Sequence, residues 1–318
     1  MIINRIKLNY NIKLLDDYFQ NKDYENVVKL FQSQEKSSIY YNLAQYAVNK
    51  YLTQQNYFDF APSKFVWLSS FDLEDTSYLK NFLEFYLPKA LNQSSLIDDY
   101  KSIFSSTFEN LNIKNFPKHI AFDEVVRDSF LHQLIISIYS KKDLIFTSTS
   151  AAFFEAPQNK FLIFPQTTLC HFYLIRNPYI LYQRYKDTFQ NSQEALNELN
   201  DTNEKPNYPN SFNFTVEENR QNWGSNAKSW TNKNVQSTYR GKIIKYEDLL
   251  TNPEDTLNEV VYHLKQSGAN IDIKFDLIED FVKNNSLSEI KIDENSKKES
   301  KMVKGALDQF IMDEYDYS

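Results

Sequence analysis

The spacing of hydrophobic residues changes near residue 60. Before that point apolar residues recur three and four positions apart, over residues 14–32 with a polar break at 21–23, and again over residues 39–52. Such spacing gathers apolar side chains on one side of a helix. It predicts a helical hairpin followed by a third helix. We expect these helices to pack on the domain that follows, and to bury Phe19, Phe31, Leu43 and Tyr46.

After residue 62 short apolar runs alternate with amphipathic segments. Uninterrupted apolar runs predict buried strands at residues 65–68, 144–146, 171–175 and 242–246. Helical spacing predicts helices at residues 78–87, 125–139, 180–189 and 253–264. Strands separated by helices indicate a mostly parallel sheet that is covered on both faces. The predicted fold class is α/β, a three-layer sandwich with a central parallel sheet, plus N-terminal helices.

The change of pattern also predicts the domain organisation. Residues 1–58 are expected to form a helical extension, and residues 59–318 one α/β domain of ordinary size. The polar stretch at residues 191–214 predicts a long loop. The segment at residues 21–28 is similar to the turn of a tetratricopeptide repeat, but an array needs about three repeats. A protein partner that binds the N-terminal helices is one alternative that the sequence leaves open.

Composition and charge exclude several classes of function. The chain has 35 Lys and Arg against 42 Asp and Glu, and the formal net charge of −7 argues against nucleic-acid binding. One cysteine, Cys170, and four histidines predict neither an internal disulfide nor a metal site. No apolar run reaches the length of about 18 residues that a membrane span needs. Because residues 1–13 also lack a signal-peptide segment, we expect a cytoplasmic protein.

Glycine is scarce, and its distribution limits the kind of phosphate site that the chain can form. All four glycines lie at or after Gly224. A glycine-rich loop around phosphate requires a backbone without Cβ atoms, so that the anion can approach closely. The first two thirds of the chain therefore cannot contain such a loop.

Two segments carry motifs in an order and spacing that a known family shares. The first is the predicted strand Phe172-Tyr173-Leu174-Ile175, which is followed by Arg176-Asn177-Pro178 and a helix. The second contains Asn226-Ala227-Lys228-Ser229-Trp230, then Lys242-Ile243-Ile244-Lys245-Tyr246-Glu247-Asp248-Leu249, then Asn252-Pro253-Glu254. Both segments resemble the sulfotransferases that use 3′-phosphoadenosine-5′-phosphosulfate (PAPS) as sulfuryl donor.

The resemblance implies donor-binding residues. In this family the arginine at the strand end, here Arg176, holds the donor's 3′-phosphate, and the tyrosine of the second motif, here Tyr246, lies near the adenine. An arginine can grip a phosphate with two hydrogen bonds beside a helix N-terminus, so the residue suits the role. Arg184 stands where the family has a serine for the same phosphate. Lys301 and Lys304 resemble the basic segment that closes over it.

The loop that binds the 5′-phosphosulfate departs from the family. After the first strand the family has a basic, glycine-containing loop, but this sequence has Asp72, Glu74 and Asp75. Three carboxylates at this position are expected to repel a charged donor. Thr76, Ser77 and the start of the next helix retain phosphate-binding character.

The resemblance also bears on the catalytic base. Cytosolic members place a lysine and a histidine after the strand at residues 144–146, where this sequence continues Thr147-Ser148-Thr149-Ser150. Other branches use a carboxylate after the first helix to take the acceptor's proton, and the candidates here are Asp98 and Asp99. A solvated turn is the alternative for these two residues.

Taken together, the motifs imply a fold and two alternative functions. The fold is that of the sulfotransferases, which is similar to the P-loop NTPases. The implied activity is transfer of a sulfuryl group from PAPS to a hydroxyl or amine acceptor without a metal. The incomplete donor loop supports the alternative of a catalytically degenerate relative that binds a nucleotide or a protein. The sequence leaves open whether the chain is an enzyme, and the acceptor is unknown.

Overall fold

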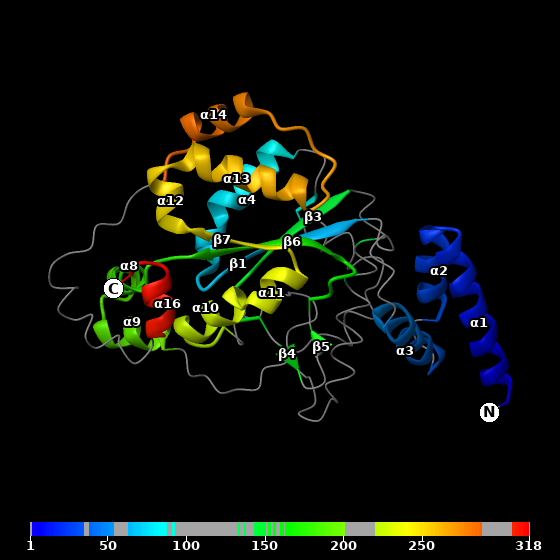
Figure 1. Cartoon of the computed structure of the whole chain (residues 1–318). Coiled ribbons are helices and arrows are strands. Elements are labelled where there is room, and N and C mark those ends of the chain that lie inside the picture. Colours follow the sequence, from blue (N-terminus) through cyan, green and yellow to red (C-terminus); the bar gives the residue numbers. More distant parts are fainter. Residues whose placement is uncertain are drawn as a thin grey trace.

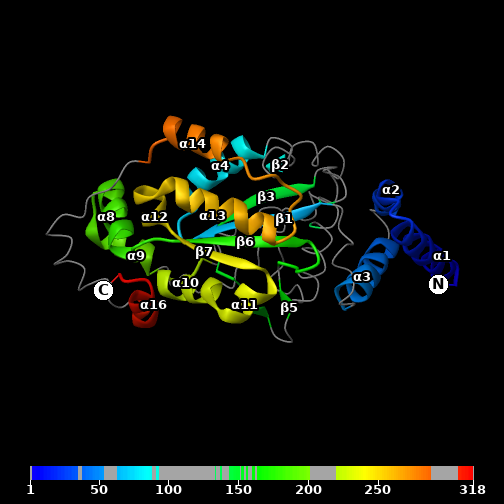
Figure 2. The same ribbon diagram turned by 45° about the horizontal axis from the view of Figure 1, so that its top comes forward.

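A computed structural model gives the three-dimensional structure of the chain. It describes residues 2–34, 38–53, 63–87, 91–92, 133, 137, 143–150, 152–153, 155–156, 160–161, 163–200, 220–287 and 307–317. Helices cover both sides of a central sheet, and three further helices lie at one end of it (Figures 1 and 2). The α/β class and the mostly parallel sheet predicted from the sequence are confirmed. The predicted helix at residues 125–139 falls mostly outside the described residues.

The central sheet has five parallel strands among the described residues, in the order β2-β3-β1-β6-β7. They are β1 (Lys64–Ser70), β2 (Leu91–Asn92), β3 (Leu144–Thr149), β6 (Thr168–Ile175) and β7 (Gly241–Lys245). All of β6 is buried, as expected of a strand with helices on both faces. The short β2 and the separate antiparallel pair of β4 (Glu155–Ala156) and β5 (Lys160–Phe161) are not predicted by the apolar pattern.

Alternating side chains of the strands enter two hydrophobic cores. Leu68 and Phe172 belong to the first core, whereas Tyr173 and Ile175 belong to the second. The first core is covered by α4 (Ser77–Tyr86), α12 (Tyr246–Thr251), α13 (Pro253–Gln266) and α14 (Phe275–Asn284). The second core is covered by α8 (Pro178–Phe189), α9 (Ser192–Leu199), α10 (Trp223–Thr231), α11 (Lys233–Thr238) and α16 (Gln309–Glu314).

Helix α9 corrects part of the predicted loop at residues 191–214. The Asn191 side chain accepts hydrogen bonds from the backbone N–H groups of Gln193 and Glu194 and so caps the helix N-terminus. Leu196 and Leu199 are buried on one side of α9. The sequence therefore contains a helix start signal that the polar composition of this stretch conceals.

The three N-terminal helices are α1 (Ile2–Gln20), α2 (Tyr24–Gln34) and α3 (Ser38–Thr53). Phe19, Phe31 and Leu43 are buried as predicted, while Tyr46 is half-buried and donates a hydrogen bond to Asp16 at 2.7 Å. The main contacts of these helices are with one another, and they lie at the opposite end of the sheet from α8 (Figures 1 and 2). Among the described elements α1, α2 and α3 thus contact chiefly one another, and their packing on the α/β domain stays a prediction.

The contacts among α1, α2 and α3 lead to a prediction about stability. Deleting residues 1–58 is expected to leave the unfolding temperature of the α/β domain nearly unchanged, because among the described elements α1–α3 contact chiefly one another. Scanning calorimetry of the full and shortened chains measures this temperature. A decrease of more than about 4 °C, equivalent to roughly 1 kcal/mol or more for a domain of this size, would mean that the bundle stabilises the domain.

Candidate functional site

The candidate site lies where β1 and β6 end. These strands are parallel neighbours, with Ser70 of β1 opposite Leu174 of β6, so the segments that follow them meet at one edge of the sheet. In parallel α/β sheets the carboxyl edge is the usual place for ligands. After β1 the chain forms a short 3₁₀ turn, η1 (Leu73–Thr76), and after β6 it enters α8 through Arg176.

Side chains that precede η1 and α8 cap the N-terminus of each. Asp72 precedes η1, and its carboxylate accepts a hydrogen bond from the backbone N–H of Glu74 at 3.0 Å. Asn177 precedes α8, and its side-chain oxygen accepts from the backbone N–H of Tyr179 at 2.9 Å. Pro178 occupies the first turn of α8, where a missing N–H has no cost. Two backbone N–H groups that could bind a phosphate, those of Glu74 and Tyr179, therefore already have acceptors within the chain.

Two arginines and two aspartates form an ion-pair cluster at this edge, which we define as Asp72, Asp75, Arg176 and Arg184. Arg176 Nη1 donates to Asp75 Oδ1 at 2.6 Å, and Arg184 Nη1 donates to the same oxygen at 3.0 Å. Arg184 Nη2 donates to Asp72 Oδ2, which also accepts from the hydroxyl of Tyr185 at 2.7 Å. Each guanidinium therefore has a carboxylate of the β1 loop as its partner.

Asp75 and Arg176 form the inner half of the ion-pair cluster, and their side chains are almost fully buried. The side chain of Asp75 is completely buried and that of Arg176 is 3 % exposed. The guanidinium carbon of Arg176 lies 4.1 Å from the ring centre of Tyr246, a cation–π distance. Burial raises the pKa of the Asp75 carboxyl, while the charges of Arg176 and Arg184 oppose that shift. A buried cation of this kind depends strongly on its carboxylate partner.

The outer half of the cluster lies closer to solvent. The side chains of Arg184 and Asp72 are 16 % and 14 % exposed. Glu74 is well exposed, and its carboxylate lies 3.9 Å from Arg184 Nη1. The sequence predicts that Asp72, Glu74 and Asp75 repel an anionic donor. The structure shows in addition that these carboxylates occupy the arginines that the resemblance assigns to the donor.

The other predicted binding residues are placed near this cluster, with different degrees of access. Tyr246 begins α12, and its ring contacts Arg176, so these two residues are neighbours in the folded chain. Thr76 is buried, and its hydroxyl donates to the carbonyl oxygen of Leu73 at 2.7 Å. Ser77 is exposed at the start of α4. The structure thus brings together the residues expected after β1, β6 and β7.

The remaining predicted site residues lie outside the described part of the chain. These are the candidate bases Asp98 and Asp99 and the basic residues Lys301 and Lys304. Within the described ranges, no group of three or more His, Cys, Asp or Glu side chains is arranged to hold a metal ion.

Sequence reasoning overlooks a second set of contacts beside the ion-pair cluster. The Glu247 carboxylate accepts from the backbone N–H of Asn177 and from the Tyr317 hydroxyl, both at 2.9 Å. The indole N–H of Trp223 donates to the carbonyl oxygen of Arg176 at 3.2 Å. Glu247 belongs to the second motif. The Tyr317 hydroxyl also donates to the carbonyl oxygen of Ile175 at 3.3 Å, and because 142 residues separate the two, no local spacing signals this contact.

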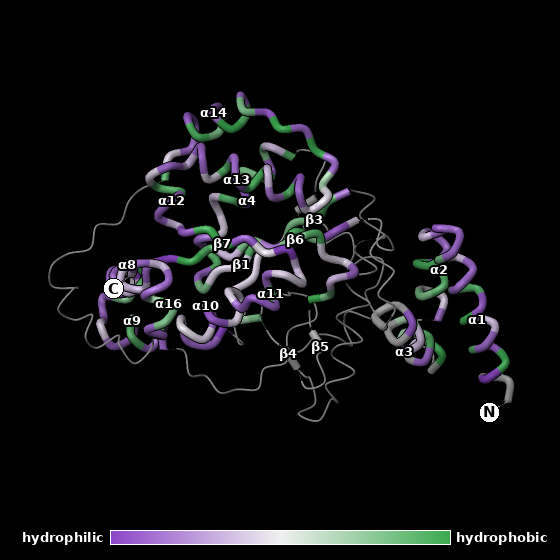
Figure 3. Tube along the Cα trace, viewed as in Figure 1, coloured by the Kyte–Doolittle hydropathy of each residue, from purple (hydrophilic) through white to green (hydrophobic). Residues whose placement is uncertain are grey.

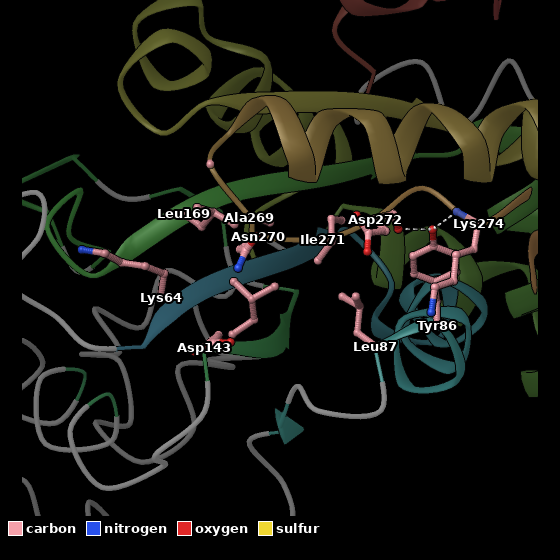
Figure 4. A pocket seen from close by; sticks show the side chains of 12 residues that line it. Lys64, Tyr86, Leu87, Asp143, Leu169, Ala269, Asn270, Ile271, Asp272 and Lys274 are labelled. Atoms are coloured by element: carbon pink, nitrogen blue, oxygen red, sulfur yellow. Dashed lines mark hydrogen bonds between the residues drawn. The ribbon is translucent and has the colours of Figure 1, made fainter.

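A cavity of about 450 Å³ lies at the opposite edge of the sheet, between the start of β1, the end of α4 and the segment after α13 (Figure 4). The Tyr86 hydroxyl forms one wall, donating to the carbonyl oxygen of Asp272 and accepting from the Lys274 N–H. Among the described residues, the charged ones that line the cavity are Lys64, Lys274, Asp143 and Asp272. Their formal charges balance, so this described lining has no positive surplus of the kind expected of a phosphate site.

The fold and the site define an α/β protein with a parallel sheet. At the edge where its strands end, the arginines of the ion-pair cluster are paired with aspartates of the same chain. No model of a known protein family matches the sequence, and no curated protein matches it either. Among the helices that the structure describes, none combines the length and the apolar character needed to cross a bilayer.

Proposed function

We propose that this chain is a sulfotransferase-like protein that does not transfer a sulfuryl group and that acts as a protein-interaction module. One observation carries the proposal: Arg176 and Arg184 both donate to Asp75, at 2.6 and 3.0 Å. Carboxylates and phosphates offer arginine the same paired acceptor geometry. The β1 loop thus supplies its own anions at the place where the resemblance puts the donor.

The burial of this ion-pair cluster opposes donor binding. A donor phosphate at Arg176 would have to displace Asp75, whose side chain is completely buried. The displaced carboxylate would stay next to the phosphate, and like charges in a poorly hydrated site repel strongly. Because residues 1–223 contain no glycine, the β1 loop also cannot approach a phosphate as a glycine-rich loop does.

Nucleotide binding, with or without sulfuryl transfer, is the second candidate function. It is favoured by Arg176, whose Nε has no hydrogen-bond partner among the described residues and whose guanidinium lies against Tyr246. In this alternative PAPS binds through its 3′-phosphate and adenine, and Asp98 or Asp99 takes the proton of the acceptor. Arg184 would then exchange its carboxylate partners for the donor phosphate.

Calorimetric titration with 3′-phosphoadenosine-5′-phosphate distinguishes the two candidates. For the proposed function we expect no binding at ligand concentrations up to about 1 mM. This corresponds to a standard free energy of binding of less than about 4 kcal/mol in magnitude. For the second candidate the wild type binds, and Arg184→Gln weakens binding roughly ten- to a hundredfold, because a charge-assisted hydrogen bond to phosphate is lost. Measurable binding that Arg184→Gln weakens would therefore contradict the proposed function.

A further inference from the structure

Helix α1 carries apolar residues on two sides. Leu15 and Phe19 are buried on one side of α1, and α1 contacts α2 and α3. On another side, Ile6 and Tyr10 are 65 % and 62 % exposed. Leu14 continues this second side and is half-buried. A spacing of four residues places these last three side chains in one row, which we call the outer stripe: Ile6, Tyr10 and Leu14.

The position of α1 leaves the outer stripe accessible. In both views of the ribbon, α1 is the member of the bundle that lies farthest from the sheet (Figures 1 and 2). Hydrophobic and hydrophilic residues alternate along the whole of α1, in keeping with a helix that has more than one apolar side (Figure 3). One apolar side of α1 is therefore buried, and the other is exposed in the part of the chain that the structure describes.

Basic residues accompany the outer stripe. Arg5, Lys7 and Lys13 are exposed beside it. Residues 2–15 contain no Asp or Glu, although the whole chain has a formal net charge of −7. This part of α1 is therefore positively charged in an acidic protein, and its natural partner is an anionic surface.

We propose that α1 binds the surface of an anionic lipid membrane through the outer stripe. Ile6 and Tyr10 enter the boundary between headgroups and acyl chains, and Arg5, Lys7 and Lys13 contact lipid phosphates. Helices that lie in the membrane interface combine an apolar side with flanking basic residues in this way. A tyrosine also suits the interface, because its ring is apolar and its hydroxyl stays hydrated.

Charge and shape favour a membrane over other occupants. In a symmetric dimer through this side, the basic residues of one α1 would face those of the other, and like charges would oppose association. An acidic protein partner would need a groove that fits a helix, whereas a lipid surface adapts to a convex one. Because the proposal uses no residue of the ion-pair cluster, it stands independently of the proposed function.

The expected binding is weak and reversible. Only two well-exposed apolar side chains and three basic residues reach the lipid, and each basic residue near an anionic surface contributes about fivefold to the partition coefficient. The acidic remainder of the chain is repelled by the same surface. The α/β domain should therefore face away from the membrane while α1 lies on it.

Co-sedimentation of the full chain with lipid vesicles tests the proposal. We expect at least about tenfold stronger partitioning onto vesicles of phosphatidylserine and phosphatidylcholine than onto phosphatidylcholine alone. Lys7→Gln should weaken partitioning about fivefold. The matched control is Lys29→Gln on α2, which removes the same charge from a side chain that is 62 % exposed, and it should have no effect. The double variant Ile6→Ser, Tyr10→Ser should abolish binding while circular dichroism shows unchanged helix content.

Several outcomes would overturn the proposal. Equal partitioning onto neutral and anionic vesicles, or none at millimolar lipid, would exclude an anionic membrane as the partner. An equal effect of Lys29→Gln and Lys7→Gln would mean that net charge alone governs binding. If gel filtration shows a dimer that Ile6→Ser, Tyr10→Ser converts to a monomer, the outer stripe is a contact between two copies of the chain.

Discussion

Replacing Asp75 with Asn is expected to lower the free energy of unfolding by about 3–5 kcal/mol. Asp75 is the shared acceptor of Arg176 and Arg184, and the side chains of Asp75 and Arg176 are exposed by no more than 3 %. The amide keeps the shape of the carboxylate but removes its charge, so the buried guanidinium of Arg176 loses its counter-ion. A change of this size is a large part of the stability of an ordinary domain.

Urea unfolding followed by circular dichroism measures this loss. Glu74→Gln is the matched control from the same loop, because it removes the same charge from a side chain that is 83 % exposed. We expect the control to unfold close to the wild type, since exposed ion pairs contribute little. If Asp75→Asn were as stable as the wild type, the ion-pair cluster would not hold the β1 loop and α8 together.

The same variant connects stability with the proposed function. In Asp75→Asn the two guanidinium groups lack the carboxylate that neutralises them, so an added anion can take its place. Inorganic phosphate is therefore expected to raise the unfolding temperature of Asp75→Asn more than that of the wild type, because a ligand that binds the native state stabilises it. If phosphate raised the unfolding temperature of both proteins equally, removing the Asp75 charge would not have created an anion site at the ion-pair cluster.

The central fold is well predicted from sequence because the signal is local. Strands β1 and β6 are nearly continuous runs of buried apolar residues, and such runs can be recognised without knowing their neighbours. The two-residue β2 has no comparable pattern, since it joins the sheet through its pairing with β3. In α9 the N-cap at Asn191 is a local helix signal, but the polar residues around it favour a loop.

The sequence names the four residues of the ion-pair cluster but not the contacts between them. The sequence correctly places acidic residues after β1 and arginines after β6 at one edge of the sheet. It treats the two groups separately, one as repelling a donor and the other as binding it. Arg176 and Arg184 follow Asp75 by 101 and 109 residues, so only the folded chain shows that they meet. The ion-pair cluster is therefore a tertiary feature that no motif contains.

The histidine of β6 leads to the second large effect, which depends on pH. His171 is 1 % exposed, and its ring lies against Trp230 with 5.2 Å between the ring centres. Its Nε2 lies 3.0 Å from the side-chain nitrogen of Gln236. Burial lowers the pKa of His171 to about 3, because the charged ring would lose its hydration.

A lowered pKa makes the folded state sensitive to acid. Above the ordinary histidine pKa of about 6.5, His171 is neutral in both states and does not change stability. Between about 6.5 and the folded value of about 3, the unfolded chain binds a proton that the folded chain does not, so stability falls as the pH falls. At pH 4.5 this one residue should lower the free energy of unfolding by about 3 kcal/mol relative to pH 7.

The variant His171→Asn isolates this contribution from that of the carboxylates. We expect it to be less stable than the wild type at pH 7, because packing against Trp230 is lost, and to lose about 3 kcal/mol less than the wild type between pH 7 and pH 4.5. Urea unfolding at several pH values gives both quantities. His263→Asn serves as the control, since the His263 ring is only half-buried and should account for a smaller part of the acid sensitivity. Parallel pH profiles for the wild type and His171→Asn would show that His171 takes up its proton as readily in the folded chain as in the unfolded one.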